Sequence, residues 1–65
     1  MKLWIARDKV GNLRMYDKKP IKDTGWFCAT GDNLPILLYT DLFPDVVFEN
    51  SPQEVEINLV RNETH

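Results

Sequence analysis

The sequence predicts an all-β, or β-dominated, protein: a small, strongly curled antiparallel sheet of about four to five strands built from hairpins. Three observations predict this fold class. A hydrophobic–turn–hydrophobic pattern covers residues 3–17, two more short β-prone runs follow at residues 26–29 and 36–39, and apolar and polar residues alternate strictly at residues 54–59. The 65 residues have room for a single small domain, residues 1–65, whose own core is marginal.

The first hairpin is the most specific part of this prediction. Residues 3–7 and 13–17 flank a turn in which Gly11 can adopt the left-handed conformation that closes a three-residue loop at residues 9–11. The loop length sets the register, and the expected cross-strand pairs are Asp8 with Asn12, Arg7 with Leu13, Ala6 with Arg14, Ile5 with Met15 and Trp4 with Tyr16. The expected core face carries Leu3, Ile5, Leu13 and Met15, and the opposite face carries Lys2, Trp4, Arg14 and Tyr16.

The middle of the chain is expected to hold a second hairpin. Residues 17–25 are a polar connection and the most basic segment of the chain. The β-prone runs at residues 26–29 and 36–39 then pair with each other across the longer loop at residues 30–35.

Two short elements are expected after this hairpin. Residues 40–44 predict a tight turn or a single helical turn, which Thr40 or Asp41 would cap and Pro44 would end. Residues 46–48 predict a further short strand before a turn.

Residues 53–61 support two interpretations. Residues 51–54, Ser-Pro-Gln-Glu, match a capping box with proline at the first helical position, which favours the start of a helix. In contrast, Val55, Ile57 and Leu59 alternate with polar residues, and this period of two favours a strand. We expect the strand, because periodicity over several residues outweighs a four-residue cap, and the helix stays as the alternative.

Apolar side chains from all these segments are expected to form one core. Its expected members are Leu3, Ile5, Leu13, Met15, Phe27, Ile36, Leu38, Leu42, Phe43, Val55, Ile57 and Leu59.

Charge is divided along the chain. Residues 1–33 carry seven basic and four acidic side chains, whereas residues 34–65 carry one basic and six acidic side chains. Such a division either closes within the fold or presents two oppositely charged surfaces to partners. If the C-terminal strand pairs with the first strand, four charged residues share one outer face: Lys2, Arg14, Glu54 and Glu56. The charges left over are then the lysines of residues 18–22 and the acids of residues 41–49.

The chain offers little to catalysis or to metal binding. Its one cysteine, Cys28, lies in a β-prone run and is expected to be a small buried residue, and its one histidine, His65, is the last residue. A structural zinc site needs about four Cys or His ligands. Glu54 and Glu56 alone would make a poor calcium site. The sequence therefore predicts no enzyme, no catalytic residue, no metal site and no cofactor.

Aromatic and basic residues gather on the non-core face of the first hairpin and just after it. The candidate interaction surface comprises Trp4, Arg14, Tyr16, Lys18, Lys19 and Lys22. Trp4 and Tyr16 are either exposed or covered by the second hairpin or by another subunit. Exposed aromatic pairs on small sheets mark protein interfaces, and self-association would also support a marginal core. The sequence therefore predicts a non-enzymatic protein-interaction domain that binds a protein partner or itself, as a homodimer.

Nucleic acid is the alternative partner. The same residues could stack bases and contact phosphates, as in sheets that bind single strands. The net charge of −2 and the pI near 5.1 argue against this alternative. No apolar run is long enough to span a bilayer and no signal-peptide pattern is present, so a cytoplasmic location without membrane contact is expected.

Four segments carry a resemblance to a known family. They are MKLWIARDK at residues 1–9 with Gly11, KPI at residues 19–21, LFP at residues 42–44 and FENSP at residues 48–52. With them the chain resembles a family of short uncharacterised proteins from gut Bacteroidetes and their mobile elements. The resemblance covers most of the chain and implies no activity, cofactor or site residue. It implies a role in phage or mobile-element biology, as a small accessory binder or, as a lesser alternative, as an acidic mimic of nucleic acid.

Overall fold

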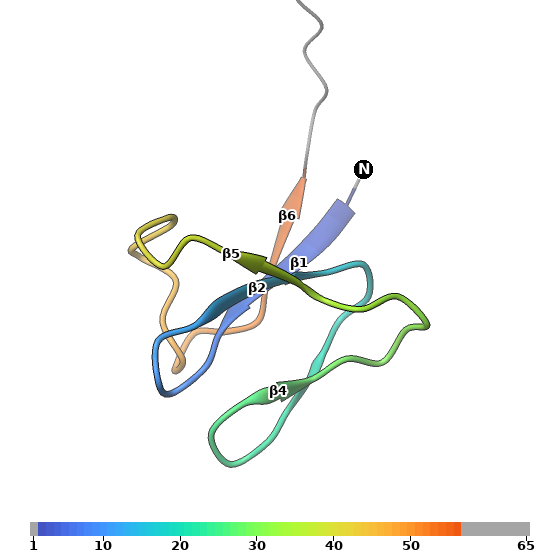
Figure 1. Cartoon of the computed structure of the whole chain (residues 1–65), viewed down its shortest axis with the longest axis horizontal. Helices are drawn as coiled ribbons and strands as arrows, with labels where there is room; N and C mark the ends of the chain where they lie inside the picture. Colours follow the sequence, from blue (N-terminus) through green and yellow to red (C-terminus); the bar gives the residue numbers. More distant parts are fainter. Residues whose placement is uncertain (1, 57–65) are drawn as a thin grey trace, which may run out of the picture.

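The computed structural model describes residues 2–56, and within them it contains six β-strands and no helix (Figure 1). The strands are β1 Lys2–Arg7, β2 Leu13–Tyr16, β3 Ile21–Lys22, β4 Phe27–Cys28, β5 Ile36–Leu38 and β6 Gln53–Glu56. Four of them form an antiparallel sheet in the order β5-β2-β1-β6, and β3 and β4 form a separate two-stranded sheet. The predicted all-β antiparallel fold is therefore confirmed. Within residues 2–56, no helix could cross a membrane.

The β1–β2 hairpin has the predicted register. Trp4 lies opposite Tyr16, and the remaining pairs follow down to the turn. Gly11 closes the loop with a φ of 110°, a conformation that residues with a Cβ rarely adopt. The Asp8 amide donates to the Asn12 carbonyl (2.9 Å), as the three-residue loop requires.

The segment before residue 57 is a strand, as the alternating pattern predicted. Strand β6 pairs antiparallel with β1, and Val55 lies opposite Leu3 on the core side of the sheet. The two further expected core residues of this segment, Ile57 and Leu59, lie outside the described residues.

The predicted second hairpin is wrong. Strand β4 pairs with β3, which lies inside the expected polar connection, and β5 pairs with β2 instead of β4. A short turn joins β3 to β4, in which the Asp23 amide donates to the Trp26 carbonyl (2.8 Å). A short turn costs less closure entropy than the longer loop between β4 and β5. Strand β5 meanwhile gains contact with the core, because Leu38 lies opposite the fully buried Leu13.

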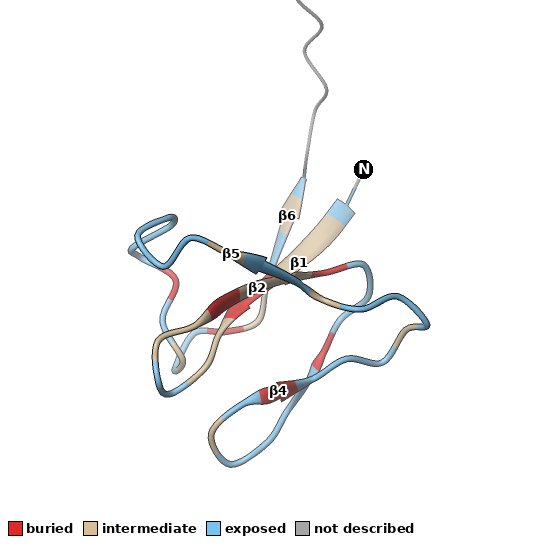
Figure 2. Cartoon of the chain, viewed as in Figure 1, coloured by how far each residue is buried: buried red, intermediate tan, exposed pale blue. Residues whose placement is uncertain are grey.

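Both faces of the four-stranded sheet are covered, and each has its own core (Figure 2). On one face, Ile5 and Leu13 pack with Val46 from the segment after β5. On the other face, the small side chain of Ala6 allows close packing, and the residues of this second core are Ala6, Tyr16 and Phe27, with Trp4 and Phe48 against them. The single expected core is therefore replaced by two, and Trp4 and Tyr16 pack into the second.

Residues 40–45 and 48–50 form turns and bends, so the tight turn predicted for residues 40–44 is present, whereas its helical alternative and the strand predicted for residues 46–48 are not. The Leu42 amide donates to the Tyr39 carbonyl (3.1 Å) and the Val46 amide to the Phe43 carbonyl (2.9 Å). These turns direct Val46 inward. Three residues expected in the core are exposed instead: Ile36, Leu42 and Phe43.

Candidate interaction surface

Strand β5 is the open edge of the sheet, and its side chains are apolar. Among residues 2–56, the strand order leaves β5 with β2 on one side and no strand on the other (Figure 1). Ile36 is 56% exposed and Leu37 is 64% exposed, and Leu34 and Tyr39 on either side are more exposed still. Figure 2 shows β5 largely in the colour of exposed residues. We call residues 34–39 the β5 edge.

The two edges of the sheet differ in charge. Strand β6, at the other edge, carries Glu54 and Glu56, both exposed. Charged residues on an edge strand oppose the addition of another strand. Residues 33–40 contain no charged side chain. The β5 edge therefore lacks the protection that β6 has.

At the β5 edge, the backbone N–H and C=O of Leu37 are directed away from β2. The Asp8-to-Asn12 hydrogen bond makes these two residues a bonded pair, and bonded and non-bonded pairs alternate along an antiparallel ladder. Leu13 and Met15 are then in non-bonded pairs with β1 and direct their backbone groups toward β5. Their partners on β5, Leu38 and Ile36, therefore direct their own groups toward β2. The N–H and C=O of Leu37 point away from the sheet, where a further strand would lie.

A hollow of about 340 Å³ adjoins this edge. Its walls include Leu3, Met15, Leu34 and Ile36, so it continues the apolar surface of the β5 edge toward the first core. An apolar side chain from an added strand would find an apolar wall there.

The aromatic residues of the predicted surface are not an exposed pair. Tyr16 is 4% exposed and packs with Ala6 and Phe27, and burial raises its pKa above the ordinary value of 10.0. Trp4 is partly buried against the same core, and the Lys19 ammonium lies 5.5 Å from the centroid of the Trp4 rings. Alternation placed both aromatic residues on the non-core face, but the β3–β4 hairpin covers that face.

Two of the basic residues of the predicted surface lie against the second core. The Lys19 ammonium lies over Trp4, and Lys22 Nζ lies 4.3 Å from the Phe48 ring centroid and donates to the Phe48 carbonyl (2.9 Å). Arg14 Nη1 pairs with the Asp8 carboxylate at 3.1 Å, and Lys18 is exposed. The structure therefore gathers Trp4, Tyr16, Lys19 and Lys22 around the second core, where Tyr16 is buried and Trp4 is partly buried.

Part of the predicted charge pairing is present. Glu56 lies opposite Lys2 and Glu54 opposite Trp4, on the face that also holds Arg14, as expected. The ion pair found within residues 2–56 joins Arg14 to Asp8 across the hairpin turn rather than to either glutamate.

Asp8 organises this turn through both carboxylate oxygens. One oxygen accepts hydrogen bonds from the Gly11 and Asn12 amides (both 2.9 Å), and the other pairs with Arg14. Burial raises the pKa of Asp8, but these hydrogen bonds together outweigh burial and hold the pKa below its ordinary value of 3.8.

Arg7 has a structural role that the sequence analysis missed. Its guanidinium donates hydrogen bonds to five backbone carbonyls, those of Val46 (2.5 Å), Gly11 (3.0 Å), Thr40 (2.9 Å), Leu42 (2.8 Å) and Phe43 (3.2 Å). A guanidinium has five N–H groups, so all can be used. The signal was available, because alternation places Arg7 on the face of Leu3 and Ile5, where a charged side chain needs partners.

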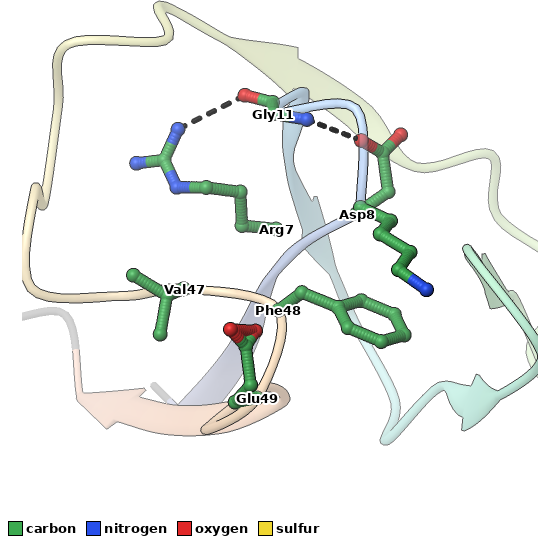
Figure 3. A pocket seen from close by; sticks show the side chains of 7 residues that line it. Arg7, Asp8, Gly11, Val47, Phe48 and Glu49 are labelled. Atoms are coloured by element: carbon green, nitrogen blue, oxygen red, sulfur yellow. Dashed lines mark hydrogen bonds between the residues drawn. The ribbon is translucent and has the colours of Figure 1, made fainter.

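A pocket of about 450 Å³ lies beside Arg7 (Figure 3). Figure 3 shows the guanidinium turned toward Gly11, with Phe48 and Glu49 on the segment that leads to β6. Lys9 and Glu49 supply charges of opposite sign to the walls. The guanidinium is already engaged by carbonyls, so the pocket does not present a surface of one charge to a ligand.

Cys28 is exposed, and the expectation that it is buried is wrong. Neighbouring strand residues face opposite sides, and in β4 it is Phe27 that faces the second core. Among residues 2–56 there is no group of three Cys, His, Asp or Glu side chains close enough to hold a metal ion.

No protein-family model, curated protein or solved structure matches this chain. The function must therefore be argued from the chain's own residues.

Proposed function

We propose that this chain is a non-enzymatic protein-interaction domain that binds its partner by adding a strand to the β5 edge. The observation that carries the proposal is the exposed, uncharged edge strand with the backbone groups of Leu37 directed outward. In this mode of recognition, backbone hydrogen bonds provide affinity and alternate side chains provide specificity. We include a cytoplasmic location, supported by the free and exposed Cys28, because thiols are kept reduced there.

Side-chain exposure favours a protein partner over a nucleic acid. The two aromatic residues that were predicted to stack bases are poorly accessible, because Tyr16 is buried and the Lys19 ammonium lies over Trp4. In contrast, the β5 edge combines four exposed apolar side chains with no charge: Leu34, Ile36, Leu37 and Tyr39. Such an edge is suited to an extended apolar segment of a protein.

The proposal can be tested by NMR titration of the isotope-labelled chain. The probe is a short synthetic peptide of alternating valine and threonine with a lysine at each end. We expect the amide signals of Leu37 and Tyr39 to shift with added peptide, and those of Glu54 and Glu56 to stay in place. For the monomeric chain, the absence of any shift at the β5 edge at millimolar peptide would overturn the proposal.

The matched variant is Leu37→Pro. It removes the outward N–H of the edge, and edge strands tolerate proline where the N–H faces solvent. The Leu13–Leu38 and Met15–Ile36 pairs should survive, so the circular dichroism spectrum should match that of the wild type. Peptide-induced shifts should be lost in this variant. Shifts of unchanged size would show that the peptide binds elsewhere and would contradict the proposal.

A further inference from the structure

We infer that the strand added to the β5 edge is β5 of a second copy of this chain, antiparallel and related by a two-fold axis at Leu37. The two four-stranded sheets would then join into one continuous sheet. This inference rests on the proposed function, because it names the partner that the β5 edge binds.

The backbone of the β5 edge is complementary to itself. Leu37 is the outward-directed residue within β5, and continuing the alternation by one step beyond each end of the strand gives Pro35 and Tyr39. About an axis at Leu37, the Leu37 N–H and C=O of each copy bond to those of the other. Pro35 then lies opposite Tyr39 of the second copy, and its carbonyl can accept from the Tyr39 amide.

In this pairing the Tyr39 carbonyl would have no donor in the second copy, but it already has a donor in its own chain. Pro35 has no N–H to offer to the Tyr39 carbonyl opposite. That carbonyl accepts a hydrogen bond from the Leu42 amide (3.1 Å) within its own chain. The two-fold axis therefore places Pro35, which has no N–H, opposite the Tyr39 carbonyl, which already accepts a hydrogen bond. An unrelated strand would leave its own N–H at this position facing an occupied carbonyl.

Side chains along the proposed seam are also compatible. Leu37 meets Leu37, and Ile36 meets Leu38 of the second copy, so apolar pairs occupy the centre. The nearest acidic residues, Asp32 and Asp41, lie outside the uncharged segment, and the register does not place either of them opposite an acidic residue. Two chains of net charge −2 thus meet along the part of each that carries no charge.

Pairing through the other edge is disfavoured by charge. Joining β6 to β6 would bring Glu54 and Glu56 of both copies into one seam, and like charges opposite each other are destabilising. The seam at β5 is short, so the dimer belongs with small, weak interfaces, and we expect dissociation on the order of micromolar concentrations.

Sedimentation velocity on charge variants of Leu37 tests the axis directly. The wild type should pass from monomer to dimer between low-micromolar and millimolar concentrations. Leu37→Lys and Leu37→Glu should each stay monomeric, because an axis at this position sets each charge against its own copy. Mixing the two variants should restore a dimer. Leu37 is exposed, so neither substitution removes a core contact.

The matched control is Val10→Lys. It adds the same charge at a residue that is 87% exposed in the hairpin loop, away from the β5 edge. It should dimerise as the wild type does. Loss of dimer in this control would overturn the assignment of the seam, because it would trace the effect to net charge.

The outcomes separate the two proposals. A wild type that stays monomeric at millimolar concentration overturns the self-pairing, and the proposed function still stands if the edge amides respond to peptide. A dimer that survives in Leu37→Lys, or a lysine and glutamate mixture that stays monomeric, overturns the axis at Leu37. Both proposals are overturned if the chain is monomeric and its amide signals at the β5 edge do not shift with added peptide.

Discussion

Replacing Arg7 by methionine should remove a large share of the stability of this fold. The methionine keeps most of the apolar length of the side chain and eliminates all five hydrogen bonds to carbonyl groups. Three of these carbonyls, of Thr40, Leu42 and Phe43, lie in exposed contacts and can bond to water instead. Those of Val46 and Gly11 are partly buried, so their bonds decide the cost.

The size of the effect follows from these two partly buried bonds. A hydrogen bond to a charged group contributes about 1.5 to 3 kcal/mol, so the loss of two gives a cost of about 3 kcal/mol or more. A chain of 65 residues has a total free energy of unfolding of roughly 3 to 10 kcal/mol. Arg7→Met should therefore unfold at a much lower urea concentration than the wild type, and Arg7→Lys should fall between the two.

Urea unfolding followed by the fluorescence of Trp4 and Trp26 measures this effect. The control is Arg14→Met, the same substitution on the neighbouring strand. Within residues 2–56, Arg14 forms one ion pair, with Asp8, and Asp8 keeps two amide donors without it, so we expect a cost of about 1 kcal/mol or less. Equal costs for Arg7→Met and Arg14→Met would refute the view that Arg7 holds residues 40–46 in place.

Three further predictions concern the turn and the start of β6. Because the pKa of Asp8 is lowered by folding, its contribution is present above the ordinary value of 3.8 and is lost as pH falls through the folded value. The stability gap between wild type and Asp8→Asn in urea should thus be wide at neutral pH and narrow in acid; a constant gap would contradict this. Gly11→Ala meets no atom but forces alanine to a φ of 110°, so it should lower unfolding free energy by roughly 1 to 2 kcal/mol in the same assay, and an unchanged midpoint would count against the strain. Ser51→Ala removes the acceptor of the Arg7 amide (3.0 Å) and the donor to the Val47 carbonyl (2.6 Å), so it should cost roughly 1 to 3 kcal/mol and speed hydrogen exchange at the Arg7 amide; unaltered exchange would refute the contact.

Local signals were sufficient for the β1–β2 hairpin and for β6. A three-residue loop ending in glycine permits one register, and that register keeps the two faces of the hairpin distinct. The alternation that begins at Glu54 predicted a strand, although a capping box at residues 51–54 favoured a helix. The strand is present beside β1, and it packs Val55 against the first core. In both cases the deciding residues are near neighbours in the sequence.

Pairings between distant segments were not predictable in the same way. Strand β3 is two residues long and both are exposed, so no periodic pattern distinguishes it from the loop around it. The second core forms because Phe27 and Phe48, which lie in separate segments of the chain, pack in the same cluster as Ala6. The same applies to Val46, whose burial follows from turns that Arg7 holds in place.

The sequence by itself determined the fold class, the first register and an uncharged segment at residues 33–40. Only the tertiary structure decided that this segment is an open edge and that the aromatic face of the first hairpin is covered. The physical reason is that turn geometry and alternation act between near neighbours, whereas burial depends on which distant segment covers a face. Trp4 and Tyr16 of the predicted surface thus pack into a second core, and a strand expected in the core became the proposed site.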